Sequence, residues 1–223
     1  MGAAPRQLHQ ARAVDTRRKL LAAAAAVFDD KGYAATTTAD IVAEAEATKG
    51  ALYFHFSTKE QIAQAIIQEQ ASWLDSLPVD EEHPVQAVIN ISYWVSSALR
   101  TDVIMRASIR LTIERNTFST PDQDAYQQWE QALEQRWERA SDEGLLAASW
   151  TPHAAAALVA GSFTGLQLVS QVASEDRRDL PARLTDFWNA VLPSLVSARG
   201  RKNLVVPPSP EWVSETVPLR PNA

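Results

Sequence analysis

Apolar side chains recur every three to four residues along most of the chain, which is the spacing of one face of an α-helix. In the first such segment Leu20, Ala24, Val27 and Phe28 form a single stripe. Period-two alternation, the sign of a strand, is not sustained anywhere. The pattern predicts an all-α fold of about nine helices. These span about 15–30, 37–45, 58–74, 85–100, 102–115, 122–143, 152–174 and 181–199, with one more short helix that begins at Thr48.

Two short helical segments joined by a tight turn follow the first helix. The earlier one covers 37–45, and the later one opens at Thr48 and carries the run Tyr53-Phe54-His55-Phe56. This arrangement is typical of a helix-turn-helix, whose second helix enters the major groove of DNA. We expect Phe54 and Phe56 in the core of this unit.

The residue types of the second short helix suit contact with DNA. Lys49 can reach a guanine edge or a phosphate, and Ala51 can touch a thymine methyl group. Gly50 lets the helix approach the groove, while Tyr53 and His55 can donate hydrogen bonds to phosphates. The alternative is that Tyr53 is a core aromatic and His55 an ordinary surface residue. The expected DNA-contacting residues are Thr37, Thr38, Thr48, Lys49, Gly50, Ala51, Tyr53, His55 and Lys59.

Composition narrows the classes of function. The net charge is −6, but residues 1–60 hold 8 Lys/Arg against 7 Asp/Glu, so the excess of acid lies in the rest of the chain. A basic front end on an acidic body fits DNA binding, although a chance cluster of solvated charge would look the same. The absence of cysteine excludes disulfides and thiolate metal sites. Catalytic and metal-binding motifs are also missing, so we expect no enzyme, no metal and no cofactor.

Targeting signals are not apparent in the sequence. No apolar run approaches the length of a membrane span, and the N-terminal residues lack the apolar core of a signal peptide. We therefore expect a cytoplasmic protein associated with the nucleoid.

Several spaced motifs together resemble the TetR family of transcriptional repressors. They are Val27-Phe28-Asp29-Asp30-Lys31-Gly32-Tyr33, Thr37-Thr38-Ala39-Asp40-Ile41, Thr48-Lys49-Gly50-Ala51-Leu52-Tyr53-Phe54-His55-Phe56 and Lys59-Glu60. The wording of the third motif is similar to the γ-butyrolactone-receptor subgroup, with weaker likeness at 106–111 and 161–171. The resemblance implies a homodimer that leaves a palindromic DNA operator when a butyrolactone- or butenolide-type signal binds the C-terminal domain.

The same resemblance suggests residues for the effector and for the dimer. It implies Trp129 as a wall of the ligand pocket, with Gln70, Ser162 and Gln167 as hydrogen-bonding groups, although core packing is the plainer role for any one tryptophan. Gly161 and Gly165 permit close helix packing, and with Phe187 and Val191 they would form the four-helix dimer interface of the family.

One departure from the family pattern lies in the turn of the helix-turn-helix. Family members usually carry Ala-Gly-Val, whereas this chain has Ala45-Glu46-Ala47. A left-handed backbone at Glu46 would cost roughly 1 kcal/mol.

The expected organisation has four parts. A flexible basic arm covers 1–14, the helix-turn-helix domain 15–60, the ligand-binding and dimerisation domain 61–199, and a Pro-rich disordered tail 200–223. Two alternatives stay open: a TetR-type regulator that senses an antibiotic or biosynthetic intermediate, and a DNA-binding protein without an effector.

Overall fold

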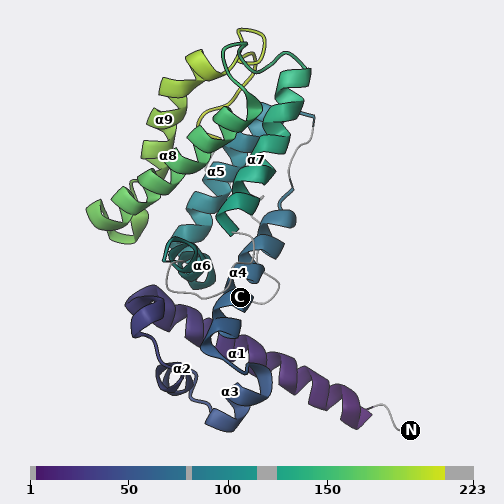
Figure 1. Ribbon diagram of the computed structural model, residues 1–223, viewed down its shortest axis with the longest axis vertical. Coiled ribbons are helices and arrows are strands. Elements are labelled where there is room, and N and C mark those ends of the chain that lie inside the picture. The colour runs from purple at the N-terminus through teal and green to yellow at the C-terminus, as the bar shows by residue number, and fades with distance from the viewer. Residues whose placement is uncertain (1–3, 79–81, 115–124, 209–223) are drawn as a thin grey trace. The chain divides into compact units, whose positions relative to one another are not determined.

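The structure, a computed structural model, describes residues 4–78, 82–114 and 125–208. Its α-helices are α1 (Ala4–Ala35), α2 (Thr38–Glu44), α3 (Lys49–His55), α4 (Lys59–Asp75), α5 (Pro84–Thr101), α6 (Val103–Ile113), α7 (Ala125–Asp142), α8 (Pro152–Ala173) and α9 (Leu180–Leu195), with a 3₁₀ turn η2 (Glu175–Arg177) before α9 (Figure 1). The all-α prediction is confirmed for the described residues, and so is the helix order.

The chain forms two compact units. The first comprises 1–74 with 102–122, and the second 75–101 with 123–223. By this division α6 lies in the first unit, whereas the sequence assigned it to the C-terminal domain. Residues 209–223 of the expected tail lie outside the described residues.

The first unit is built around α1. Leu20, Leu21 and Phe28 of α1 are buried against Ile41 of α2 and Leu52 of α3. Further buried side chains come from α4 and α6: Ile62, Ala63, Ile66, Ala107 and Leu111. Helix α1 packs on α2, α3 and α6, so the short helices are held by a core larger than three helices alone provide.

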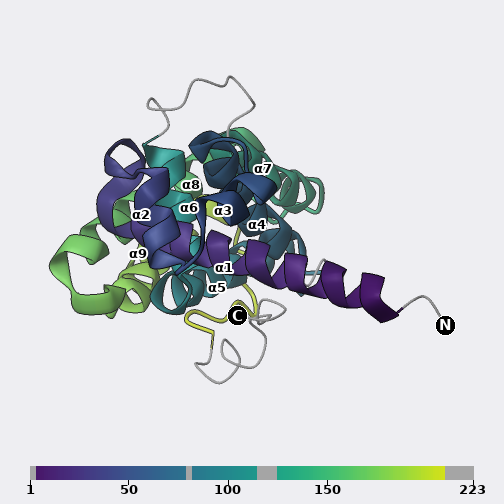
Figure 2. The same cartoon turned by 90° about the horizontal axis from the view of Figure 1, so that it is seen from below.

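Helix α1 begins earlier than expected. The sequence predicted a flexible arm over 1–14, but the helix already includes residues 4–14. Figures 1 and 2 show its N-terminal turns extending beyond α2 and α3. The alanine, arginine and glutamine residues of this segment have high helix propensity, which a search for apolar stripes does not register.

Gly32 bends the C-terminal end of α1. Its φ of 76° and ψ of 172° lie in a region that only glycine occupies readily. The side chains of Arg110, on α6, and of Glu114, at the C-cap of α6, fill the bend. Arg110 donates to the backbone oxygens of Asp29 and Asp30, and Glu114 accepts from the Tyr33 N–H at 2.9 Å. A Cβ at Gly32 would lie 2.8 Å from either Glu114 oxygen, so the bend and the ion pair of Arg110 with Glu114 depend on glycine.

The second unit is a bundle of α5, α7, α8 and α9 in which α7 and α9 each pack on both α5 and α8 (Figure 1). Three tryptophans are fully buried in it: Trp94, Trp137 and Trp188. Helix α8 is long and apolar enough to cross a membrane by length and composition, yet only 39% of its most apolar window is buried. Its opposite side therefore presents apolar surface.

A carboxylate fixes the corner between α8 and α9. Asp179 accepts from Ser170 and Ser174, the latter at 2.6 Å, and from Arg183 Nε at 2.6 Å. These hydrogen bonds, first that of Ser170 and then that of Ser174, lower the pKa of Asp179 from 3.8 to about 2.

The depressed pKa predicts a pH-dependent contribution to stability. A carboxylate with a folded-state pKa below its unfolded value stabilises fully above pH 3.8, and the stabilisation is lost as the pH falls towards 2. Asp179→Asn should therefore lower the Tm at pH 6, and the gap to wild type should close as the pH approaches 2. Thermal unfolding followed by circular dichroism checks this, and a gap of constant size would contradict the assignment.

Candidate functional site

Helix α3 is short and is fixed at both ends. Thr48 caps its start, with its hydroxyl accepting from the Ala51 N–H at 3.1 Å. Leu52 points into the core and is 1% exposed, and Phe56 at the C-terminal end is 4% exposed. The remaining face of α3 is open to solvent.

That open face carries residues predicted to touch DNA. Lys49 and Gly50 are exposed, Tyr53 is 53% exposed, and Ala51 and His55 are half-buried. Within the described part of the chain, neither the Lys49 ammonium nor the Tyr53 hydroxyl has a hydrogen-bond or ion-pair partner, so both groups are available. Phe54 departs from expectation: the prediction of a core residue is wrong, because its side chain is 79% exposed.

Helix α2 is held by a reciprocal cap. The Thr37 hydroxyl accepts from the Asp40 N–H at 3.1 Å, and the Asp40 carboxylate accepts from the Thr37 N–H at 2.8 Å. The Thr37 hydroxyl also donates to the Asp40 carboxylate at 2.6 Å, and Lys31 pairs with that carboxylate at 2.9 Å. The hydrogen bond from the Thr37 hydroxyl first, then those from Lys31 and the Thr37 N–H, hold the pKa of Asp40 far below its usual range. Thr37 is exposed and Thr38 is half-buried, so both remain accessible at the start of α2.

The turn between α2 and α3 forces Glu46 into the left-handed region, with φ at 47°. The Glu46 N–H bonds to Ala43 O at 3.1 Å and the Ala47 N–H bonds to Val42 O at 3.1 Å. These two bonds are the Schellman termination of a helix, in which the left-handed position is normally glycine. The turn keeps the usual geometry although this chain lacks the usual residue.

Because Glu46 is strained, replacing it should stabilise the protein. Glu46→Gly should raise the free energy of unfolding by up to about 1 kcal/mol, because it removes the cost of a left-handed side chain. Glu46→Asn should gain a smaller amount, since asparagine tolerates the left-handed region better than glutamate but less well than glycine. Urea denaturation measures both. A loss of stability in the two variants would mean that the Glu46 side chain makes a contact worth more than the strain.

Lys59 has a different role from the phosphate contact predicted for it. Its ammonium donates to the backbone oxygens of Tyr33 and Thr36, both at 2.8 Å, and lies 4.1 Å from the centre of the Tyr33 ring. Burial lowers the pKa of Lys59. The Lys59 ammonium thus satisfies carbonyl oxygens at the C-terminal end of α1. Lys59 is therefore not among the proposed DNA contacts.

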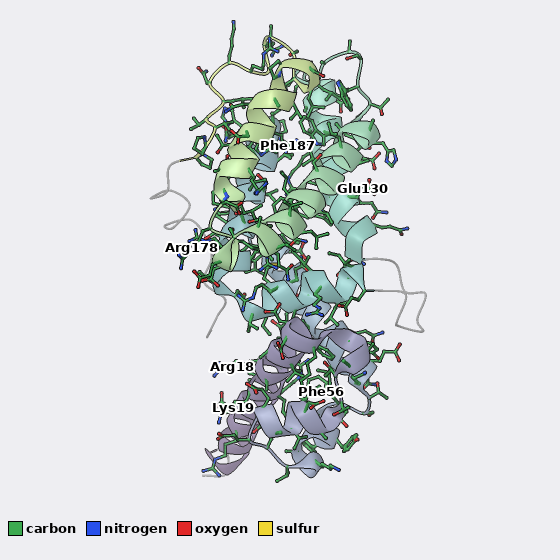
Figure 3. The ribbon with its side chains drawn as sticks, turned by 90° about the vertical axis from the view of Figure 1, so that its left-hand side faces the viewer. Arg18, Lys19, Phe56, Glu130, Arg178 and Phe187 are labelled. Carbon is green, nitrogen blue, oxygen red and sulfur yellow. The ribbon has the colours of Figure 1, made fainter. Side chains whose placement is uncertain are left out.

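Arg17 is a basic residue to which the sequence analysis assigned no contact. The guanidinium of Arg17 on α1 lies 5.2 Å from the centre of the Phe56 ring, beside the C-terminal end of α3. Among the described residues Arg17 has no ion pair, whereas its neighbour Arg18 pairs with Asp15 at 3.5 Å. Figure 3 shows Phe56 among the helices and Arg18 and Lys19 pointing away from them.

The predicted ligand residues fall in different surroundings. Gln70 belongs to the first unit, where its oxygen accepts from the buried Ser108 hydroxyl at 2.5 Å. Trp129 on α7 packs on Phe163 of α8 with ring centres 6.5 Å apart. Gln167, one turn after Phe163, is 1% exposed, and Ser162 is half-buried on a flank of α8 away from Gln167.

Gln167 is unusual because neither polar atom of its buried amide has a hydrogen-bond partner in the described structure. Trp137 Nε1 of α7 and Ser96 Oγ of α5 are buried and unpaired as well. By contrast, Trp188 Nε1 donates to Ser92 Oγ at 3.0 Å. Sequence reasoning missed Trp137 and Ser96, since an unpaired N–H or hydroxyl is visible only in three dimensions.

The predicted dimer residues lie on α8 and α9. Gly161 and Gly165 are exposed on the side of α8 opposite its buried residues, and a Cβ at Gly165 would meet nothing within 4 Å. Leu168 and Val172 continue this face at 40% and 90% exposure. Phe187, labelled in Figure 3, and Val191 are half-buried on α9.

Comparisons with known proteins agree with this architecture. A family model described as "Bacterial regulatory proteins, tetR family" matches residues 20–66. The chain is 39% identical to the A-factor receptor protein of Streptomyces griseus over 83% of its own length, and it spans 66% of that relative. It also resembles a crystal structure of a gamma-butyrolactone receptor (ArpA-like protein), with 25% identity, a TM-score of 0.72, and 92% and 98% of the two chains covered.

One solved structure decides the family. Full-length TylP, a TetR regulator from Streptomyces fradiae, is 33% identical, with a TM-score of 0.75, and the match covers 91% of this chain and 96% of TylP. Regulators of this kind are DNA-binding proteins that form dimers and take small-molecule ligands, and they are not enzymes. With its matched helix-turn-helix and its likeness to TylP over nearly the full length, the chain belongs to the TetR family of bacterial regulatory proteins.

Proposed function

We propose that this protein is a cytoplasmic homodimeric repressor that leaves a palindromic operator when a γ-butyrolactone- or butenolide-type molecule binds within its second unit. The observation that carries the gating part is the set of buried, unpaired polar groups of the apolar bundle, Gln167, Trp137 and Ser96. Likeness to the A-factor receptor protein and to gamma-butyrolactone receptor structures supports the ligand class.

The polar groups match the chemistry of such a ligand. A γ-butyrolactone ring offers a carbonyl oxygen and a ring oxygen, both of which accept hydrogen bonds. Trp137 supplies a donor, Gln167 a donor and an acceptor, and Trp129 with Phe163 an aromatic wall. An unpaired buried polar group costs about 1–3 kcal/mol. A ligand that satisfies these groups therefore binds more tightly than its apolar area alone would give.

Two pairs of variants test the effector site. Gln167→Met is near-isosteric and removes both unpaired atoms, so it should stabilise the ligand-free protein by about 1–3 kcal/mol and abolish the ligand-induced rise in Tm. Trp137→Phe should lower the affinity for the ligand by about tenfold, the effect of losing one hydrogen bond. Its matched control Trp188→Phe loses the same ring volume but breaks a satisfied hydrogen bond, so it should lose stability and keep the response.

The measurement is thermal shift and operator release with a panel of γ-butyrolactones, butenolides and antibiotics. We expect butyrolactones or butenolides to release the operator from the wild type and not from Gln167→Met. Release by an antibiotic alone would favour a sensor of a drug or biosynthetic intermediate. If no compound raises the Tm or frees the DNA, the effector proposal fails.

The DNA-binding face of the proposal is the open side of α3 with the start of α2. We assign Lys49 to a base edge or phosphate, Tyr53 and His55 to phosphates, and Gly50 and Ala51 to close approach. Thr37, Thr38 and Thr48 are kept as hydrogen-bonding residues at the helix starts.

Operator binding is measured on a duplex that the wild type selects from a random-sequence library. Lys49→Ala should weaken it by about tenfold or more, and unchanged affinity would remove α3 as the recognition helix.

Arg17 is proposed as a phosphate contact beside α3, because the Phe56 ring positions its otherwise unpaired guanidinium. Arg17→Ala should reduce the slope of log affinity against log salt by about 2 for a dimer, roughly 0.9 for each lost contact. Arg18→Ala removes the same charge one residue away, from a side chain paired with Asp15, and should change the slope less. Equal slopes for the two variants would reduce Arg17 to a contribution to overall charge.

A further inference from the structure

Phe54 occupies a position that neither the core nor hydrogen bonding explains. It is 79% exposed on α3, and exposing a ring of this size to water is unfavourable. The neighbouring Tyr53 is also exposed but ends in a hydroxyl that can reach a phosphate. Phe54 has no polar atom, so its only favourable contact with a partner is apolar.

The ring is held in a defined orientation. Its centre lies 4.9 Å from that of the His55 ring, with the two planes at 86°. Such an edge-to-face contact restricts the side chain before any partner binds. Gly50 lies one turn earlier on the same open face, and a Cβ there would find only Thr48 Oγ1, at 3.8 Å. On this face, Gly50 presents no side chain, and the Phe54 ring projects one turn later in an orientation set by His55.

The surroundings of Phe54 favour a nucleic-acid partner over a protein. The exposed neighbours on α3 are Lys49, Gly50 and Tyr53, so the ring stands alone among basic and polar groups. A protein-binding surface would need further apolar side chains around it. In the major groove the apolar group that a base pair offers is the 5-methyl of thymine, which phenylalanine contacts in direct readout.

We propose that Phe54 determines sequence specificity by packing on the 5-methyl group of a thymine in each operator half-site. This inference rests on the proposed operator-binding function. It assigns Phe54 a contact that depends on the base, in addition to the phosphate contacts around it.

The test is a double-mutant cycle on the duplex selected by the wild type from a random-sequence library. Each thymine of a half-site is replaced in turn by uracil, which lacks the methyl group and keeps base pairing. Wild type should lose about five- to tenfold in affinity at one position or at two adjacent positions. Phe54→Ala should bind the thymine duplex about tenfold more weakly and no longer distinguish thymine from uracil there.

Three controls keep the result interpretable. Phe54→Leu should retain part of the discrimination, and Tyr53→Phe should retain all of it while losing overall affinity. Urea denaturation of Phe54→Ala should match wild type, since the side chain is exposed. A selected duplex whose uracil forms bind wild type normally, or an unchanged thymine-to-uracil ratio in Phe54→Ala, overturns the inference alone. Failure of wild type to select any sequence overturns the proposed function and the inference with it.

Discussion

Gly32→Ala should lower the stability of the first unit by about 3 kcal/mol or more, through two effects that add. Backbone angles of 76° and 172° cost a residue with a Cβ about 1–3 kcal/mol. The new Cβ would lie 2.8 Å from the Glu114 oxygens and 2.9 Å from Arg110 Nη2. Glu114 can swing aside, but the Tyr33 N–H then loses its charged acceptor, which costs about 1.5–3 kcal/mol.

Two other glycines make matched controls for the two effects. Gly144 has a φ of 69° with nothing within 4 Å of a Cβ, so Gly144→Ala should show backbone strain alone, about 1–2 kcal/mol. Gly50 lies in a helix with open space beside it, and Gly50→Ala should stabilise by up to about 1 kcal/mol. Urea denaturation of the three variants should rank them Gly50→Ala, Gly144→Ala and Gly32→Ala. Equal losses of stability at Gly32 and Gly144 would show that the contacts of Gly32 with Arg110 and Glu114 contribute nothing beyond backbone strain.

Local signals in the sequence were sufficient for most of the fold. Thr37, Thr48 and Thr58 cap the starts of α2, α3 and α4, as their hydrogen bonds to the backbone show. The strain expected at Glu46 is present because the turn geometry is set by the helices on either side. What the sequence could not give is which helix packs on which. The contact of α6 with α1 joins residues about eighty positions apart, and no periodicity encodes it.

The candidate sites were predictable to the extent that residue type decides a role. Lys49 and Tyr53 lie on the open face of α3 as expected. Phe54 was assigned to the core because aromatic residues are usually buried, but on a helix of seven residues a single turn of Leu52 and its neighbours already fills the inward side. Lys59 and Gln70 found partners inside the first unit. Such pairings depend on tertiary contacts that residue type does not specify.

The proposed dimer interface predicts the second large effect, because operator binding depends on it. Gly161, Gly165, Leu168 and Val172 follow one another at helical spacing on the side of α8 that faces away from the bundle core. An exposed apolar stripe of this length, interrupted by glycines, suits close packing against the same helix of a second copy.

Val172→Glu should therefore convert the dimer to a monomer of 24.5 kDa in analytical ultracentrifugation. A charge within such an interface would be buried without a partner, which disfavours association. Gln171→Glu adds the same charge one residue earlier, off the stripe, and should stay dimeric. Loss of the second recognition helix should weaken operator binding by about 100-fold or more in Val172→Glu, since the two half-sites no longer bind as one unit.

A Val172→Glu protein that remains dimeric would place the interface elsewhere. One that becomes monomeric yet binds the full operator normally would contradict the need for two linked recognition helices.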